Sequence, residues 1–170
     1  MRAATRGRTE GVATMVTLLT TPADRELVIT RTFDAPPARV WEAWTVPEHV
    51  REWYGAAVLT TTVVDIDLRP GGAWRWGQTA PDGQEIVFSG TYEDVVPVER
   101  LDYTEVFEQM PDAEPVRVNL AFDATPDGGT ALTSTSFWPS NDIRDQALEA
   151  GMEAGVREQY DRLAEYLASM

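Results

Sequence analysis

The amino-acid sequence predicts an α+β fold in which a curved antiparallel sheet of six to seven strands wraps around a long C-terminal helix. In the middle of the chain, apolar and polar residues alternate over short stretches, as they do in half-buried strands. Only a few turn-forming residues separate these stretches, so crossover helices do not fit between them and the strands are antiparallel. Near the C-terminus the apolar residues change to a helical period.

The first predicted elements are one strand and two short helices. An alternating stretch predicts the strand over residues 26–33. Pro37 and Pro47 are each placed to start a helix, because proline is favoured in the first helical turn. We therefore expect helices over residues 37–45 and 47–53.

Six further strands are predicted between residues 59 and 137. Every separator between them contains proline, which fixes φ, or glycine, which accepts a positive φ, as in Pro81-Asp82-Gly83. The predicted strands span residues 59–68, 72–78, 85–96, 100–108, 116–123 and 130–137.

A single long helix is predicted from residue 143 to residue 168. Its apolar residues fall on one face and its acidic residues on the other. Gly151 and Gly155 lie on the apolar face, where each costs about 1 kcal/mol of helix propensity. Either a close approach of helix and sheet or open space beneath the helix would account for these glycines.

The charge balance excludes several classes of function. The 170 residues include 28 acidic and 14 basic side chains, so the net charge is −14 at neutral pH. Such a surface repels phosphate backbones and anionic lipids, so neither nucleic acid nor a membrane is expected as a partner. Every basic residue is arginine and cysteine is absent, which excludes lysine Schiff bases, thiolate nucleophiles and disulfides. Neutral, cationic or apolar partners remain.

The length and the lack of long apolar runs predict one cytoplasmic domain. Residues 23–170 form that domain in this interpretation, and residues 1–22, which are mostly small and polar, form a flexible N-terminal extension. The sequence contains neither a signal-peptide core nor a run of about 20 apolar residues. Met15 is an alternative start, and both a monomer and a homodimer are compatible with the sequence.

Several local phrases of the sequence are distinctive as a set. They are Phe33-Asp34-Ala35-Pro36, Val40-Trp41-Glu42-Ala43-Trp44-Thr45, Trp53-Tyr54-Gly55, Asp67-Leu68-Arg69-Pro70-Gly71-Gly72, Gly90-Thr91-Tyr92 and Gly151-Met152. Together with the order of elements, they resemble the START-like SRPBCC superfamily, and within it the group named after the C-terminal domain of the activator of the ninety-kilodalton heat-shock chaperone's ATPase. Two positions depart from that group: Ala56 stands where many relatives have proline, and Val156 where many have an aromatic residue.

The resemblance implies a helix-grip fold, with a cavity between the curved sheet and the long helix that often holds an apolar small molecule. It does not imply one reaction, because the superfamily includes lipid and hormone binders, polyketide cyclases, oxygenase domains and co-chaperone modules. The function therefore has to be inferred from the cavity itself.

Strand alternation predicts which side chains face that cavity. Residues two apart in a strand share a face, so Trp74 and Trp76 are expected to point together toward the helix. Large aromatic residues opposite glycines and serines are the combination that a cavity wall requires; if the aromatic side chains interlock instead, the space is filled as in an ordinary core. The predicted cavity residues are Trp74, Trp76, Phe88, Tyr92, Tyr103, Glu105, Phe107, Phe122, Ser134, Ser136 and Met152.

Glu105 falls on the apolar face of its predicted strand. An unpaired carboxylate is costly there, so an inward Glu105 requires a raised pKa or a partner. Such a group would anchor a substrate or, with Tyr103, act as a general acid or base. The alternative is a bulge that turns Glu105 toward solvent.

The sequence lacks the combinations of residues that are typical of metal sites and of serine or cysteine nucleophiles. His49 is the only histidine, and beside Glu48 it is expected to make a helix-end hydrogen bond. Without a histidine pair or a cysteine, neither a metal site nor a cofactor is predicted. Ser134 and Ser136 lack a nearby histidine and the glycines of a nucleophile elbow, which argues against serine catalysis.

The sequence favours a protein that binds a small apolar or aromatic molecule, without established catalysis. Two alternatives stay open. A polyketide cyclase or hydratase-like enzyme would use the same cavity, with Glu105 or Tyr103 moving protons. A chaperone-interacting module is suggested only by the name of the similar group.

Overall fold

The structure, a computed structural model, describes residues 16–170. The elements in chain order are β1 (Leu18–Thr20), β2 (Glu26–Phe33), α1 (Pro37–Thr45), α2 (Pro47–Trp53), β3 (Thr60–Ile66), β4 (Ala73–Thr79), β5 (Glu85–Val96), β6 (Arg100–Phe107), β7 (Val116–Ala124), β8 (Thr130–Phe137), α3 (Asn141–Glu149) and α4 (Met152–Ser169). Within this part of the chain, no helix combines the length and the apolar character needed to cross a membrane.

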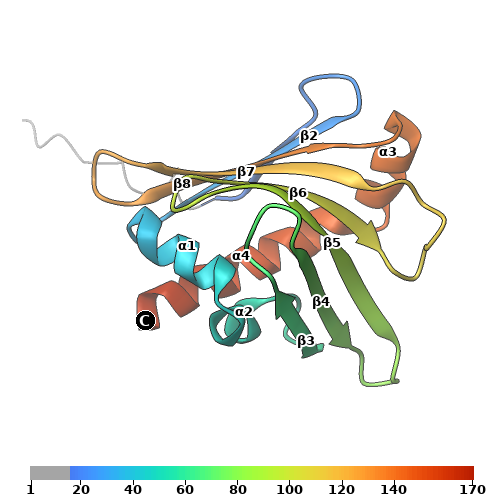
Figure 1. Ribbon diagram of the computed structural model, residues 1–170, viewed down its shortest axis with the longest axis horizontal. Coiled ribbons are helices and arrows are strands. Elements are labelled where there is room, and N and C mark those ends of the chain that lie inside the picture. Colours follow the sequence, from blue (N-terminus) through green and yellow to red (C-terminus); the bar gives the residue numbers. More distant parts are fainter. Residues whose placement is uncertain (1–15) are drawn as a thin grey trace, which may run out of the picture.

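The strands form one antiparallel sheet, in the spatial order β1-β2-β8-β7-β6-β5-β4-β3. Figure 1 shows β2, β7 and β8 across the top, β3, β4 and β5 descending from them, and α4 passing beneath the sheet. The register between β5 and β6 shifts between Tyr92 and Asp94, and such an irregularity increases the local bend of a strand. The predicted α+β fold, with a curved sheet around a C-terminal helix, is confirmed.

The sheet has one buried face, which is the physical reason for the alternating sequence pattern. In β2 every second residue from Leu27 to Phe33 is buried, and β7 buries Val116, Val118, Leu120 and Phe122 in the same way. A strand places successive side chains on opposite faces, so a period of two follows from burial on one side only. The predicted bounds of the strands from β2 to β8 agree with the observed bounds within two residues.

The two short helices begin and end at the predicted residues and close one end of the core. Pro37 and Pro47 occupy the first turns of α1 and α2, where the missing backbone N–H costs no helical hydrogen bond. Trp53 is fully buried, and its indole Nε1 donates a hydrogen bond to the backbone oxygen of Ala43 over 2.9 Å. This bond fixes α2 against α1.

The prediction of one unbroken helix from residue 143 to residue 168 is wrong. The chain forms α3 and α4, separated at Gly151, which has a φ of +99°. That left-handed conformation ends a right-handed helix, and glycine adopts it without steric cost. Gly151 and Gly155 are also exposed, and a Cβ at either position would meet no atom within 4 Å, so neither lies on the buried face as predicted.

A short strand lies within residues 1–22, which the sequence assigns to an N-terminal extension. Residues 1–15 lie outside the described residues, but β1 falls within the predicted 1–22 extension and pairs with β2, which raises the number of strands to eight. Thr17 is buried, and its Oγ1 accepts a hydrogen bond from Nη1 of Arg31 over 3.1 Å. Pairing with β2 and this buried contact hold β1 in place. The composition of this segment alone does not predict an ordered strand.

Candidate functional site

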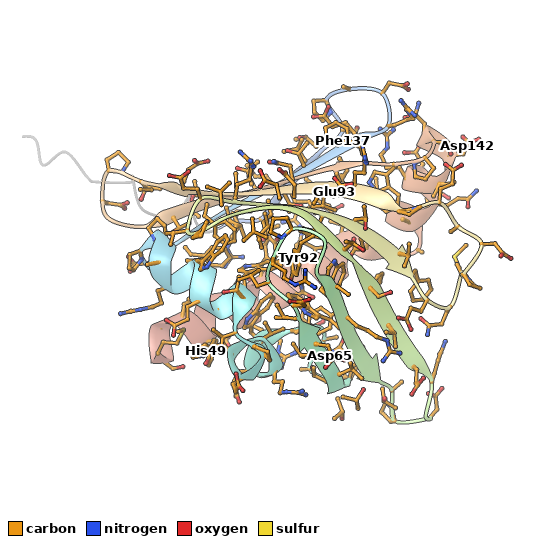
Figure 2. The ribbon with its side chains drawn as sticks, viewed as in Figure 1. His49, Asp65, Tyr92, Glu93, Phe137 and Asp142 are labelled. Atoms are coloured by element: carbon orange, nitrogen blue, oxygen red, sulfur yellow. The ribbon has the colours of Figure 1, made fainter. Side chains whose placement is uncertain are left out.

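A cavity of about 150 Å³ lies between the concave face of the sheet and α4. Figure 2 shows Tyr92 on the helix side of the sheet, inside the molecule, whereas Phe137 lies on the opposite side. The sheet, α4 and the ends of the short helices all contribute to the wall. The lining residues are Ile29, Trp44, Tyr54, Trp74, Trp76, Tyr92, Leu101, Tyr103, Glu105, Val118, Ser134, Ser136, Trp138, Met152, Val156, Gln159 and Tyr160.

Aromatic rings that meet at steep angles form much of this wall. Trp74 and Trp76, two residues apart in β4, have centroids 5.8 Å apart and planes at 73°. Trp74 contacts Tyr103 of β6 at 5.5 Å and 84°, and Trp76 contacts Tyr54 at 5.1 Å and 75°. Edge-to-face contacts of this kind are favourable between aromatic rings. These contacts also hold the rings in place along the wall of the cavity.

Glu105 brings the only ionisable carboxyl group into the lining. It follows Tyr103 by two residues in β6, so both side chains project from the same face of the sheet. Burial raises the pKa of Glu105 to about 7. Within residues 16–170, its carboxyl group has no ion-pair or hydrogen-bond partner that would lower this pKa. The bulge considered from the sequence does not turn Glu105 out of the cavity.

Four tyrosines line the same cavity as this carboxyl group: Tyr54, Tyr92, Tyr103 and Tyr160. Burial raises the pKa of each phenol above its usual value of 10, and the charge of Glu105 raises it further for Tyr54, Tyr103 and Tyr160. The phenols therefore stay protonated at neutral pH and keep a hydrogen to donate. No hydrogen bond from these four hydroxyls to another residue of the described chain contributes to their pKa values.

Two other polar side chains of the lining are already hydrogen-bonded within the protein. Ser136 donates to the backbone oxygen of Leu27 over 3.3 Å and accepts from Nε1 of Trp138 over 2.9 Å. Oε1 of Gln159 accepts from the backbone N–H of Gly55 over 3.2 Å. The carboxyl group and the phenols are therefore free to bind something in the cavity, and so are the indole Nε1 groups of Trp44 and Trp76, which have no hydrogen-bond partner among residues 16–170.

The fold and the cavity agree with a comparison against protein families. Residues 34–168 match the family described as Activator of Hsp90 ATPase homolog 1-like protein. The chain belongs to this family. It lies within the START-like SRPBCC superfamily, as the sequence phrases predicted, and no curated protein matches the chain.

Solved structures of several bacterial proteins share the fold of this family member. A protein from Rhodobacter sphaeroides is 24% identical, with a TM-score of 0.85 over 91% of this chain and 99% of that one. A protein from Mycobacterium smegmatis is 26% identical, with a TM-score of 0.79 over 88% and 95%. One from Arthrobacter aurescens is 21% identical, with a TM-score of 0.81 over 92% and 94%. Such similarity shows a common fold.

The cavity of this family member brings together eight of the eleven residues predicted for it. They are Trp74, Trp76, Tyr92, Tyr103, Glu105, Ser134, Ser136 and Met152. Phe88, Phe107 and Phe122 do not line it. Phe88 and Phe107 face each other across β5 and β6 with centroids 5.1 Å apart, and Phe122 packs against Trp41 of α1 at 5.3 Å. Strand alternation predicts on which face of the sheet these side chains lie, but it does not predict how far along the sheet the cavity extends.

Sequence reasoning missed three aromatic lining residues that come from helices or their ends. Trp44 lies in α1, Tyr54 follows α2, and Tyr160 lies in α4. Tyr160 was on the predicted apolar face of the C-terminal helix, but the break at Gly151 decides which part of that face covers the cavity. Trp44 recurs with other apolar residues at helical spacing, which predicts that it is buried but not that it lines a cavity.

His49 lies outside the cavity, near the helices in the lower part of Figure 2. Its Nδ1 is hydrogen-bonded to the hydroxyl of Tyr166, and its Nε2 lies 3.4 Å from Oε1 of Glu42. This side chain therefore links α1, α2 and α4. Across residues 16–170, no three histidine, cysteine or acidic side chains are grouped so that they could hold a metal ion.

Proposed function

We propose that this protein binds a small molecule, about the size of one ring, in the cavity between the sheet and α4. An apolar cavity of about 150 Å³ in another protein holds benzene. The cavity here has a similar volume, about 150 Å³. Tryptophan and tyrosine side chains supply contact area, and the free polar groups supply orientation.

One observation carries the proposal: Glu105 lines the cavity without a partner among the described residues. An unpaired carboxyl group inside a protein destabilises the fold, and an apolar side chain would serve a purely structural core better. Pairing with a ligand would explain why a glutamate stands at this position, whereas packing of the core does not explain it.

Filling the cavity tests the proposal. In Ser134→Leu the larger side chain enters the cavity from β8, whereas Thr135→Leu makes a similar change on the opposite face of the same strand. Benzyl alcohol and benzylamine serve as a neutral and a charged probe, and tryptophan fluorescence reports binding because Trp44, Trp74 and Trp76 line the cavity.

We expect at least one probe to give a saturable fluorescence change with the wild-type protein and with Thr135→Leu. In Ser134→Leu the affinity for that probe should fall by about tenfold or more. If neither probe gives a saturable change with the wild-type protein, and tetramethylammonium does not bind either, the proposed function is wrong.

Acid–base catalysis in the same cavity is a second candidate function. Burial raises the pKa of Glu105 to about 7, where a carboxyl group both accepts and donates protons at neutral pH. An enzyme of the polyketide cyclase or hydratase kind would lose turnover in Glu105→Gln but keep its affinity for substrate. Equal turnover of wild type and variant would exclude this role for Glu105.

The family description names an activator of Hsp90 ATPase, so a chaperone contact is a third candidate. The measurement is the ATPase rate of Hsp90 with and without the purified protein. An unchanged rate, together with no co-sedimentation of the two proteins, would remove this candidate and leave ligand binding unaffected.

A further inference from the structure

We propose that the ligand of this cavity is a small organic cation, whose ammonium group pairs with Glu105 and contacts the surrounding tryptophan and tyrosine rings. This inference rests on the proposed function and specifies the chemical class of the ligand.

The charge of the lining is unbalanced. Among residues 16–170, Glu105 is the only lining residue that can carry a charge at neutral pH, and no arginine is among the lining residues. Its carboxyl group lacks a partner in residues 16–170, so its ionised form is stabilised only by what enters the cavity. A cationic ligand supplies the missing opposite charge, whereas an anion would add repulsion to the burial of the carboxylate.

The aromatic side chains favour the same class of ligand. The face of an indole or phenol ring attracts a cation within about 6 Å, and tryptophan does so best. Trp74, Trp76 and Tyr103 meet at angles of 73° and 84°, so their planes are turned relative to one another instead of stacking in one layer, and all three line the cavity. A cavity lined by such rings and one carboxylate is suited to an ammonium group with apolar substituents.

The volume limits the size of the cation. About 150 Å³ suits a tetraalkylammonium ion with short chains or a single ring that carries an aminomethyl group. A long acyl chain or a fused multi-ring molecule would exceed this volume. The net charge of −14 favours the approach of cations over anions, and this long-range effect weakens with salt.

The four phenols make a different ligand conceivable, a neutral hydrogen-bond acceptor beside a protonated Glu105. The two ligands predict opposite pH dependence, because a cation requires the carboxylate and an acceptor benefits from the carboxylic acid. The titratable groups that line the cavity with Glu105 are Tyr54, Tyr92, Tyr103 and Tyr160, all with pKa values above the usual 10. Arg31, which acts on Tyr160, is ion-paired with Asp161 over 2.7 Å.

The experiment is calorimetric titration of the full-length protein with benzylamine, its neutral analogue benzyl alcohol, and tetramethylammonium chloride. The variant is Glu105→Gln. Glu149→Gln is the matched control, because Glu149 is exposed on α3 and its replacement changes the net charge equally. Sodium chloride replaces tetramethylammonium chloride in a blank titration of equal ionic strength.

For the wild type and for Glu149→Gln we expect benzylamine to bind at least about tenfold more tightly than benzyl alcohol at about pH 8. Glu105→Gln should lose this preference. Tetramethylammonium carries a permanent charge, so its affinity for the wild type should rise about tenfold or more between about pH 5.5 and about pH 8.5 as Glu105 ionises. This pH series needs no variant and therefore does not depend on the folding of Glu105→Gln.

Two results would overturn the inference while leaving the proposed function intact. One is tighter binding of benzyl alcohol than of benzylamine to the wild type, with Ser134→Leu abolishing it. The other is affinity for tetramethylammonium that stays constant or falls as the pH rises. Absence of binding of all three probes to the wild type would overturn both the inference and the proposed function.

Discussion

At the scale of single residues, Glu105 is expected to make the stability of the protein depend on pH. Its pKa is about 7 in the folded protein against an ordinary value of 4.5. The folded state therefore binds the proton more tightly, so the contribution of Glu105 to stability is most favourable below about pH 4.5 and is lost as the pH rises through about 7. A shift of this size corresponds to about 3 kcal/mol at most.

The measurement is urea unfolding of the wild type and of Glu105→Gln at several pH values between about pH 4.5 and about pH 8. Other carboxyl groups titrate in both proteins, so their contributions cancel in the difference. Glu105→Gln should gain stability relative to wild type as the pH rises. A difference that does not change with pH would mean that Glu105 is not buried in its charged form.

The sequence could predict the face of each cavity residue but not its neighbours. Alternation within β4 and β6 was enough to place Trp74 and Glu105 toward the helix side. It could not place Phe122, because the curvature of the sheet determines which inward residues meet α1 and which meet the cavity. The missing partner of Glu105 is also a property of three-dimensional contacts, which no strand pattern contains.

At the scale of elements, Gly151 and Gly155 offer a matched pair of substitutions. Gly151 has a φ of +99°, a conformation that costs an L side chain about 1–2 kcal/mol. Gly155 lies within α4, and a Cβ there would meet no atom within 4 Å. Gly151→Ala should therefore destabilise the protein by about 1 kcal/mol, and Gly155→Ala should stabilise it by up to about 1 kcal/mol.

Urea unfolding of both variants and the wild type at one pH measures the two effects. We expect the two changes in stability to have opposite signs, although each variant adds the same methyl group at an open position of the same helical region. Destabilisation by both substitutions would contradict an ordinary helical conformation at Gly155. Stabilisation by both would contradict the break at Gly151.

Element boundaries were predictable where proline or glycine marks them. The bounds of α1, α2, β5 and β8 agree with the sequence because turn residues leave little choice at their ends. The break between α3 and α4 was missed because a glycine within an amphipathic pattern fits a continuous helix as well as a left-handed stop. The short strand β1 was missed because its order comes from pairing with β2.

At the scale of the whole molecule, ion pairs with arginine balance only part of the acidic charge. Arg31 is buried in β2 and reaches Asp161 of α4 over 2.7 Å, which ties the sheet to the helix that it surrounds. Other arginines, such as Arg75 with Glu108 and Arg157 with Glu153, pair at partly exposed positions. With 28 acidic and 14 basic side chains, many carboxylates have no arginine to pair with.

Self-repulsion of this surface is expected to destabilise the fold at low ionic strength. Raising sodium chloride from about 0.02 M to about 0.5 M shortens the Debye length several-fold and screens the repulsion among carboxylates. Exposed ion pairs are also weakened, but each contributes little. Because the net charge is −14, the loss of repulsion should win, and the free energy of unfolding at about pH 8 should rise by about 1 kcal/mol.

The control uses the isoelectric point of about 4.3, where the net charge of the chain vanishes. Salt should have little stabilising effect near that pH, so the gain measured by urea unfolding should grow as the pH rises from there to about 8. An equal gain at both pH values would point to a general salt effect on apolar burial. A loss of stability at about pH 8 would mean that the ion pairs, above all the partly buried contact between Arg31 and Asp161, outweigh the repulsion of the surface.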